Sequence, residues 1–325
     1  MTTCPKCEAP ISPQHRFCEQ CGANLRWAST PCTACGSMDI GDDGFCQQCG
    51  RGQPMDRDRT ELTVSPSTGR GAVSPSSGRG AAPGGTGVLA AGVSDRGHKR
   101  QRNEDAMACV HAPRGDGVAV VAVVCDGVAS VQRGDEAAQA AVHTASEALL
   151  AAVGGAEDLR RATGEAVRQA AGAVAALAHP RGGATGPSDA GGAPSSTLVS
   201  AVVTGDEVVV GWVGDSRAYW LGEHSSCLTT DHALGGVLTR WLGADFGEVH
   251  AQVAVFQPEG AGMVLVCSDG LWNYLPEADE LAAVALPAAD PFAAADALTQ
   301  RALDAGGRDN VTVIVVPFPP QGWST

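Results

Sequence analysis

Residues 88–318 predict an α+β fold in which antiparallel sheets pack against pairs of helices. Apolar runs of strand length follow one another across short Gly/Asp turns, as in hairpins. Alanine-rich segments of helical length come in pairs instead of alternating with the strands, which argues against a doubly wound parallel sheet.

Each element of this prediction has a local reason in the sequence. The runs VAVVAVVC, VVVGWVG, MVLVC and VTVIVV are apolar and rich in β-branched residues, which is typical of buried strands. A Gly/Pro/Ser loop at 180–196 separates the first helix pair from the strands that follow. The predicted strands are 118–125, 197–204, 207–213, 217–221, 251–256, 263–268 and 310–316. The predicted helices are 134–153, 157–178, 277–285 and 290–305.

Four carboxylates adjoin these apolar runs, namely Asp126, Asp215, Asp269 and Asp309. A carboxylate at the end of a buried strand is costly unless a positive charge meets it. One such Asp is normally a cap or a turn residue. Four in one domain indicate a shared cation site, because hard divalent ions such as Mg²⁺ and Mn²⁺ take oxygen ligands.

Eight of the twelve cysteines lie in residues 1–50 as a tandem repeat of CxxC pairs. Two CxxC knuckles supply the four thiolates of a tetrahedral zinc site, so the segment resembles a double zinc ribbon with two structural Zn²⁺ ions. A redox role of the CxxC pairs is the alternative, but four tandem pairs without a βαβ context argue against it. The two predicted ligand sets are Cys4, Cys7, Cys18 and Cys21, and Cys32, Cys35, Cys46 and Cys49.

Residues 51–87 have the composition of a flexible Ser/Pro/Gly/Arg linker. The nonapeptide VSPSTGRGA at 64–72 is followed directly by VSPSSGRGA at 73–81. Its Ser and Thr residues are candidates for phosphorylation, although an inert spacer is the simpler interpretation. A DxDxT string at 56–60 matches a phosphotransferase nucleophile motif, but it follows a polar stretch where that motif requires a buried strand.

The net charge of −14 argues against nucleic acid as a partner. No apolar run is long enough for a membrane span, and the N-terminus lacks the layout of a signal peptide. We therefore expect a cytoplasmic protein without membrane contact. The cysteines outside the repeat are expected to be small core residues, namely Cys109, Cys125, Cys227 and Cys267.

Taken in order, the motifs of residues 90–316 resemble those of the bacterial metal-dependent Ser/Thr protein phosphatases of type 2C, the PPM family. These motifs are SDRGHKRQRNED, VVCDG, STLVSAVV, VGDSRAYWL, LTTDH, LTRWLG, LVCSDGLW and GGRDNVTVIVV. The resemblance implies a four-layer α/β/β/α sandwich of two antiparallel sheets flanked by helices, here preceded by a small zinc-ribbon domain. Residues 319–325 would form a short tail.

The resemblance also implies roles for the acidic positions. Asp126 would bridge two Mn²⁺ or Mg²⁺ ions, with the carbonyl of Gly127 as a further ligand. Asp269 and Asp309 would ligate the first ion, and Asp215 would share a third, weaker ion with Asp269.

Three residues of the RxxNED motif complete the implied site. Glu104 and Asp105 would act through metal-bound waters, and Arg100 would bind the phosphate with its planar fork of donors. A metal-bridging hydroxide would attack phosphorus in line, without a phosphoenzyme. The implied substrates are phosphoserine and phosphothreonine in bacterial proteins, products of a Ser/Thr kinase, which places the protein in signal transduction.

The chain departs from the family pattern at three places. The second motif reads DGVASV where bacterial members have DGMGGH, which removes a candidate proton donor for the leaving alkoxide. His98 is a possible substitute, although a solvated loop histidine is the simpler interpretation. The usual GTT is Ser195-Ser196-Thr197, and a flap segment that members carry after the Asp-His motif is nearly absent between 232 and 239.

These departures leave alternatives to an active phosphatase. One is a catalytically weak pseudo-phosphatase that acts as a metal-bound regulatory module. Another makes the zinc ribbons the functional part. Few Lys or Arg residues surround the thiolates, so the ribbons are expected to contact protein partners in preference to nucleic acid.

Overall fold

The computed structural model describes residues 59–66, 87–128, 133–155, 157–178, 192–247 and 249–320, with eight isolated residues before position 59. The chain divides into two compact units, Met1–Arg57 and Asp58–Thr325. In the first unit, β1 (Thr2–Thr3) pairs with β2 (Pro10–Ile11). The eight predicted zinc ligands lie outside the described residues.

The second unit contains two large sheets whose neighbouring strands are all antiparallel. The six-stranded sheet has the order β11 (Ser226–Cys227), β10 (Arg217–Leu221), β16 (Gly262–Cys267), β17 (Val311–Phe318), β4 (Ala90–Asp95) and β3 (Arg59–Val64). The five-stranded sheet has the order β15 (Gln252–Phe256), β9 (Val208–Val213), β8 (Leu198–Val203), β6 (Gly117–Asp126) and β5 (Asp105–Arg114).

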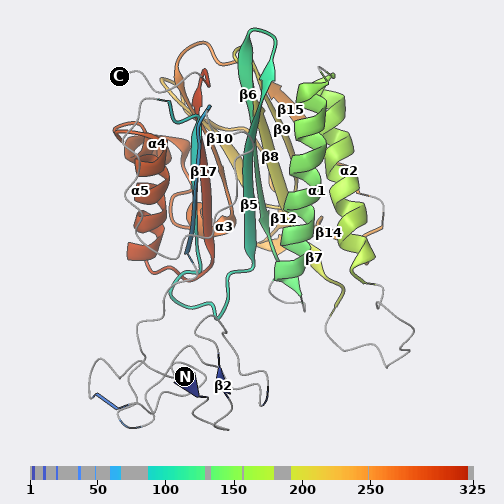
Figure 1. The fold of residues 1–325 in the computed structure, drawn as a ribbon. Coiled ribbons are helices and arrows are strands. Elements are labelled where there is room, and N and C mark those ends of the chain that lie inside the picture. The colour runs from blue at the N-terminus through green and yellow to red at the C-terminus, as the bar shows by residue number, and fades with distance from the viewer. Residues whose placement is uncertain are drawn as a thin grey trace. The chain divides into compact units, whose positions relative to one another are not determined.

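Helices cover the outer face of each sheet (Figure 1). The five-stranded sheet packs against α1 (Gly134–Gly154) and α2 (Leu159–Ala176). The six-stranded sheet packs against α4 (Ala278–Ala285) and α5 (Pro291–Asp304). The predicted four-layer α/β/β/α sandwich is confirmed.

Period-two alternation along the central strands builds three separate cores. On β6, Val121 and Val123 face the helices α1 and α2, whereas Val120 and Val124 belong to the layer between the sheets. On β17, Ile314 likewise lies between the sheets, and its sequence neighbours pack against α4 and α5. Because both faces of each strand are buried, the strands are continuously apolar in sequence.

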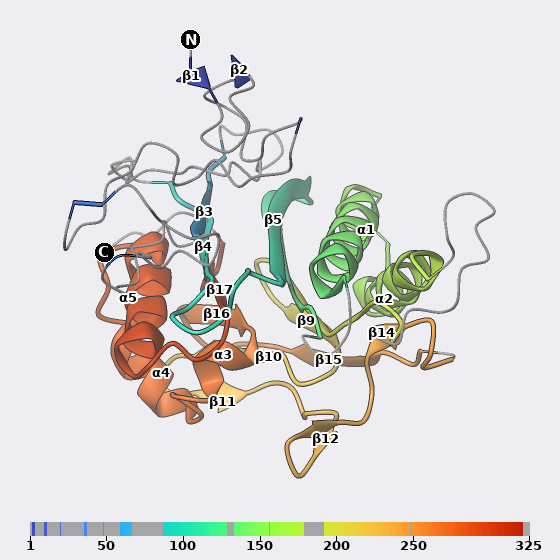
Figure 2. The same ribbon diagram turned by 90° about the horizontal axis from the view of Figure 1, so that it is seen from below.

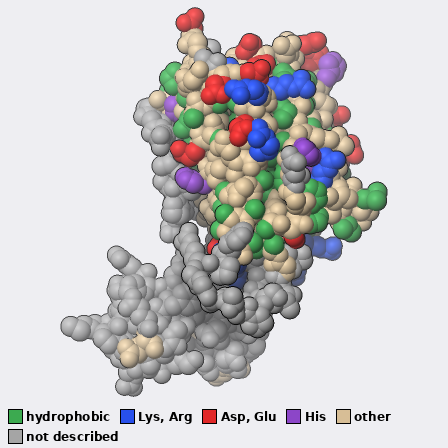
Figure 3. Space-filling model, turned by 90° about the vertical axis from the view of Figure 1, so that its right-hand side faces the viewer, with side chains coloured by type: hydrophobic (Ala, Val, Ile, Leu, Met, Phe, Trp, Pro, Cys, Tyr) green, Lys and Arg blue, Asp and Glu red, His purple; other side chains and the backbone are tan. Residues whose placement is uncertain are grey.

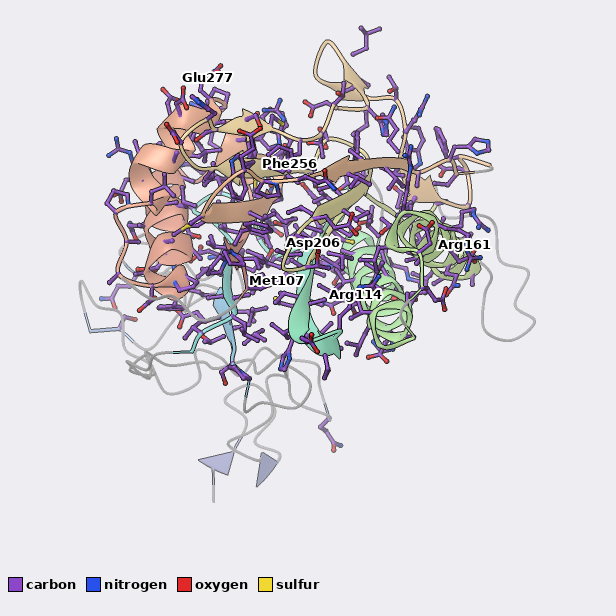
Figure 4. The ribbon with its side chains drawn as sticks, turned by 90° about the horizontal axis from the view of Figure 1, so that it is seen from above. Met107, Arg114, Arg161, Asp206, Phe256 and Glu277 are labelled. Atoms are coloured by element: carbon purple, nitrogen blue, oxygen red, sulfur yellow. The ribbon has the colours of Figure 1, made fainter. Side chains whose placement is uncertain are left out.

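The layer between the sheets is visible from the end of the sandwich where the β5–β6 and β8–β9 turns lie (Figure 4). Figure 4 labels Arg114 and Asp206 in these turns and Met107 and Phe256 in the layer itself. Asp126 lies at the opposite end of β6.

Two predicted strand pairings are wrong. The strand at 208–213 pairs with 198–203 as expected, but the next strand, β10, belongs to the other sheet. The chain crosses between the sheets at Gly214, whose φ of 107° suits glycine. The second wrong pairing concerns β15 and β16. They were expected to be neighbours, but they lie in different sheets.

The expected linker over 51–87 contains one strand, β3, which was not predicted. Over its whole length β3 pairs with β4 at the edge of the six-stranded sheet. Leu62 and Val64 of β3 are buried in the layer between the sheets, so their alternation provides the apolar surface that the rest of the segment lacks. Arg59 also binds Asp296 on α5.

Three smaller elements complete the second unit. A hairpin is formed by β12 (Ala233–Leu234) and β13 (Val237–Leu238). The strand β14 (Leu242–Gly243) pairs with β7 (Ser195–Ser196). The short helix α3 (Asp269–Trp272) follows β16 directly.

The scattered cysteines are core residues with one exception. Cys109, Cys125 and Cys267 each lie in a different core and are buried. Burial raises the pKa of the Cys109 thiol to about 12, which makes it unreactive. Cys227 on the edge strand β11 is exposed, so the expectation of a core role is wrong for this residue.

On the side that carries α1 and α2, acidic and basic side chains are interspersed (Figure 3). Arg161 on α2 forms an ion pair of 3.2 Å with Glu157, which lies just before that helix. A face of mixed charge does not form the basic patch that binds nucleic acid. Among the described residues, no helix is both long enough and apolar enough to span a membrane.

The packing of β3 predicts that Leu62→Ala destabilises the full chain. The substitution removes a side chain from the layer between the sheets, so we expect the free energy of unfolding to fall by roughly 2–5 kcal/mol. Guanidinium unfolding measures this change, with Thr63→Ala on the same strand as the control. An unchanged midpoint for Leu62→Ala would show that β3 does not belong to the folded domain.

Candidate active site

A cavity of about 460 Å³ opens at the end of the sandwich where β6 ends. All four carboxylates that adjoin apolar runs in the sequence contribute to its lining. The lining residues are Arg100, Asp126, Gly127, Val128, Ser195, Thr197, Asp215, Gly236, Val237, Leu238, Trp241, Asp245, Asp269 and Asp309.

Both sheets supply these carboxylates. Asp126 ends β6 of the five-stranded sheet, and Asp215 lies where the chain crosses from β9 to β10. Asp269 begins α3 directly after β16, and Asp309 lies just before β17, so both come from the six-stranded sheet. The sandwich therefore brings together positions that are up to 183 residues apart.

Close backbone contacts at two glycines make this arrangement possible. A Cβ atom on Gly270 would lie 1.8 Å from the carbonyl oxygen of Asn310, so only glycine lets α3 approach the start of β17 this closely. A Cβ atom on Gly127 would lie 2.4 Å from the carbonyl oxygen of Gly134. The glycines of both Asp-Gly motifs are thus required by packing, beside any role of the Gly127 carbonyl as a ligand.

Hydroxyl groups of the Ser-Ser-Thr segment hold the backbone of Asp126. The amide of Asp126 donates to Thr197 Oγ1 at 3.1 Å, and Ser196 Oγ donates to the Asp126 carbonyl at 2.9 Å. Thr197 Oγ1 also lies 2.7 Å from Ser216 Oγ, next to Asp215. The change from GTT to SST therefore keeps both hydroxyls that contact the Asp126 backbone, at positions 196 and 197.

Asp105 lies opposite Asp126 across the β5–β6 pair but does not line the cavity. Its Oδ2 accepts hydrogen bonds from Thr312 Oγ1 at 2.6 Å and from Ser268 Oγ at 2.8 Å. Burial raises the pKa of Asp105 to about 6, and the two hydroxyls oppose that rise. Glu104 is also outside the cavity lining, so both residues lie behind the carboxylates.

Asn310 fastens the RxxNED loop to the second sheet. Its Oδ1 accepts a hydrogen bond from the amide of Glu104 at 2.8 Å. Its Nδ2 donates to the carbonyls of Arg96 at 2.9 Å and Arg102 at 3.0 Å. The amide side chain thereby connects the strands that carry Asp105 and Asp309, a role that the sequence analysis did not assign to it.

Negative charge dominates the cavity. Burial, followed by the neighbouring carboxylates Asp105 and Asp269, raises the pKa of Asp126 well above its ordinary value. Burial, Asp309 and Asp215 raise the pKa of Asp269 to about 7. The pKa of Asp215 is raised as well, chiefly by burial.

The donor chemistry of this cavity fits hard divalent cations. Asp269 Oδ1 is buried without a hydrogen-bond partner, and the raised pKa values show uncompensated negative charge. Within the described residues, no three acidic, His or Cys side chains converge in a ready-made ligand set. Carbonyl groups and water would therefore complete the coordination, as is usual for Mg²⁺ sites in proteins.

Arg100 is the only Lys or Arg among the lining residues of the described cavity. Its Nη2 donates to Asp309 Oδ2 at 2.6 Å, and this contact raises the pKa of the guanidinium. The backbone carbonyl of Arg100 also accepts a hydrogen bond from Arg96. The guanidinium is thus fixed at the cavity wall.

His98 does not replace the missing histidine of the second motif. Its Nε2 lies 3.0 Å from the carbonyl oxygen of Leu303 on α5, and its ring is not part of the cavity lining. The expectation of a solvated loop histidine agrees with its position, because His98 is exposed in a turn and only its Nε2 contacts α5. Of the altered motif, Val128 lines the cavity, and residues 129–132 lie outside the described residues.

Aromatic and ionic contacts support Asp215 from behind. Trp272 Nε1 donates to the Asp215 carbonyl at 2.9 Å, and the Arg217 guanidinium lies 3.8 Å from the centre of the Trp272 ring. Arg217 also binds Asp231 through two hydrogen bonds of 2.9 and 2.8 Å. The GDSR and DH motifs are therefore one structural unit.

The β12–β13 hairpin occupies the place where the sequence lacks a long flap. Figure 2 labels its first strand, β12. The hairpin supplies Val237 and Leu238 to the cavity lining, and Trp241 follows it in the sequence. These apolar residues and Asp245 were not predicted as site residues. The cavity is thus acidic on the strand side, whereas its hairpin side is largely apolar with one carboxylate, Asp245.

Comparisons with known proteins agree with this geometry. The protein phosphatase 2C family model matches residues 94–304, and the double zinc ribbon model matches residues 4–50. The serine/threonine phosphatase stp of Listeria monocytogenes is 28% identical over 246 residues, which cover 69% of this chain and 93% of the relative.

Solved structures share the fold. The phosphatase MsPP from Mycobacterium smegmatis, determined in complex with cacodylate, has 29% sequence identity and a TM-score of 0.52, covering 70% of this chain and 97% of its own. The catalytic domain of PstP, determined with two manganese ions, has a TM-score of 0.56 at 24% identity, again over 70% of this chain and 97% of its own.

The predictions of a type 2C phosphatase and of a double zinc ribbon are confirmed, and no relative supports the pseudo-phosphatase alternative. Phosphatases named in this way act on phosphorylated Ser and Thr, which agrees with the presence of one cationic side chain, Arg100, in the described lining of an otherwise acidic cavity. The chain belongs to the protein phosphatase 2C family of serine/threonine phosphatases and carries a double zinc ribbon within its first fifty residues.

Proposed function

We propose that this phosphatase hydrolyses phosphoserine and phosphothreonine in proteins that a Ser/Thr kinase phosphorylates, using Mn²⁺ or Mg²⁺ in the acidic cavity. The observation that supports this proposal is the convergence of Asp126, Asp215, Asp269 and Asp309 on one cavity with Arg100. Two or three bound cations would neutralise the phosphate and lower the pKa of a coordinated water, the attacking group.

The position of each residue supports the role that we propose for it. Asp126 reaches the cavity from one sheet, and Asp269 and Asp309 reach it from the other, so these three would hold the two main ions with the Gly127 carbonyl. Asp215, at the crossing between the sheets, would hold the third. Glu104 and Asp105 lie behind them and would act through water.

Arg100 would bind the phosphate group. A guanidinium has five N–H donors, and the contact with Asp309 uses one nitrogen, which leaves donors for phosphate oxygens. The described lining contains no His, Lys, Tyr or Cys side chain. Solvent would therefore protonate the leaving alkoxide, without a dedicated side-chain acid.

For the N-terminal segment we propose two structural Zn²⁺ ions, each held by four of the eight CxxC cysteines, with protein partners as their target. Thiolate ligands of this kind persist in reducing surroundings, which favours a cytoplasmic location. We further propose the domain boundaries 1–50, 51–87, 88–318 and 319–325, with residues 59–64 assigned to the phosphatase fold and not to the linker.

The proposed chemistry predicts that Asp269→Asn abolishes turnover. We expect Mn²⁺-dependent hydrolysis of p-nitrophenyl phosphate and of a phosphothreonine peptide to fall by at least about 100-fold, because one ligand of the cations loses its charge. Asp116→Asn, in the exposed β5–β6 turn, is the matched control and should retain wild-type rates. Equal rates for Asp269→Asn and the wild type would contradict the assigned site.

Asp269→Asn should lose activity but gain stability when Mn²⁺ and Mg²⁺ are omitted, because the pKa of Asp269 is raised. A carboxyl whose folded pKa, about 7, exceeds its ordinary value stabilises the fold at low pH, and this contribution is lost as pH rises through 7. At about pH 8, the unfolding temperature of zinc-loaded Asp269→Asn should therefore lie several degrees above that of the wild type. Each kcal/mol in the free energy of unfolding corresponds to roughly 2–4 °C.

Thermal unfolding followed by circular dichroism measures this difference. At about pH 3.5, below the ordinary Asp pKa of 3.8, the two proteins should unfold at similar temperatures, because the wild-type carboxyl is then largely protonated in both the folded and the unfolded state. Added Mn²⁺ should stabilise the wild type more than the variant. A variant that unfolds below the wild type at about pH 8 would show that Asp269 is not under electrostatic strain.

A further inference from the structure

The β12–β13 hairpin carries apolar side chains where solvent reaches them. Three large hydrophobic residues are exposed among the described residues: Leu234 at 78%, Val237 at 69% and Val255 at 42%. Two of the three lie in this short hairpin. Single exposed hydrophobic residues are common on proteins, but two on one hairpin beside a cavity indicate a contact surface.

The hairpin shares its cavity with the carboxylates. Val237, Leu238 and Trp241 line the same cavity as Asp126, Asp269 and Asp309. Leu234 pairs directly with Val237 across the hairpin, and residues directly opposite in an antiparallel pair project from the same face. Leu234 therefore extends the apolar wall beyond the mouth of the cavity.

The turn and base of this hairpin are well defined. Gly235 and Gly236 form its two-residue loop, with φ values of 60° and 80°, which are typical of a type I′ turn. At its base, the amide of Thr239 donates to the His232 carbonyl at 2.8 Å, and the amide of His232 donates to the Gly214 carbonyl at 2.9 Å. The hairpin is thus attached to the segment that carries Asp215.

Trp241 is fixed as well. Its Nε1 donates to Asp245 Oδ1 at 3.0 Å, and its ring packs on Phe246 with centroids 5.0 Å apart. A preorganised apolar surface binds a ligand with little loss of side-chain freedom.

Charge limits what this surface accepts. The described lining contains five Asp side chains and one Arg. An acidic residue beside the phosphorylated one would be repelled by Asp245 on the hairpin side. An apolar side chain would instead cover Val237 and Trp241 and remove their surface from water.

We propose that the β12–β13 hairpin and Trp241 form a subsite for an apolar side chain that lies within two residues of the phosphorylated Ser or Thr of the substrate. This inference rests on the proposed function, because it places the phosphate at the carboxylate end of the cavity. The phosphatase would then select phosphosites with aliphatic neighbours over those with acidic neighbours.

Phosphothreonine peptides test the subsite. Each peptide carries Leu, Ser or Asp at one of four positions, namely the two residues before and the two residues after the phosphothreonine. The peptides are otherwise identical. At one or more positions, we expect kcat/KM for Leu to exceed that for Ser roughly five- to tenfold, with Asp lowest. Equal values for Leu and Ser at all four positions would overturn the proposal.

The variant Leu234→Ser/Val237→Ser removes the apolar surface without touching a residue assigned to the cations or to phosphate. We expect it to abolish the preference for Leu over Ser. Leu234→Ser alone, at a residue that does not line the cavity, should weaken this preference and leave Mn²⁺-dependent hydrolysis of p-nitrophenyl phosphate unchanged. Val255→Ser, at the third exposed hydrophobic residue, is the matched control and should keep the preference. A preference that persists in the double variant would assign it to another surface.

Two further readouts separate the remaining outcomes. If the folded wild type does not hydrolyse p-nitrophenyl phosphate with Mn²⁺, the proposed function is wrong. If it does so but shows no preference among the peptides, only the subsite is wrong. Light scattering of the full chain tests the other occupant, a second copy of the protein. A wild-type dimer that becomes a monomer on Leu234→Ser/Val237→Ser would overturn the subsite in favour of self-association.

Discussion

Crowding of negative charge at one end of the sandwich is the constraint on which the rest of this structure depends. Asp126 and Asp215 arrive from the five-stranded sheet, and Asp269 and Asp309 arrive from the six-stranded sheet. Burial and mutual repulsion raise the pKa of several of these carboxylates, so they oppose folding in the absence of cations. The three apolar cores must supply the free energy that keeps them together.

Neutral groups hold the chain segments that carry or adjoin these carboxylates. The hydroxyls of Thr197 and Ser268 and the amide of Asn310 bond to the acidic segments or to the backbone beside them. Hydroxyls and amides orient a carboxylate without neutralising it, which preserves its charge for a metal ion. Arg100 is the exception within the described lining, and its position at Asp309 suits a group that meets the substrate anion.

The short hairpin gives the acidic cavity a second, chemically different wall. Residues 233–238 replace a long flap with a type I′ turn and two exposed aliphatic side chains. Hydrogen bonds connect the base of this hairpin to Gly214, which precedes Asp215. The proposed substrate subsite is therefore attached to the segment that carries Asp215, a proposed metal ligand.

The sequence by itself determined seven of the strands, the four long helices and the acidic positions, because apolar periodicity and strand-end carboxylates are local properties. It also determined the zinc ribbon through the spacing of its cysteines. It did not predict the strands β4 and β5 or the short helix α3. Only the tertiary structure decided that β3 joins the sheet, since pairing with β4 depends on the neighbour and not on composition. It likewise decided the crossing at Gly214, the bonding of Asn310 and the apolar wall at Val237, because each depends on segments that are distant in sequence.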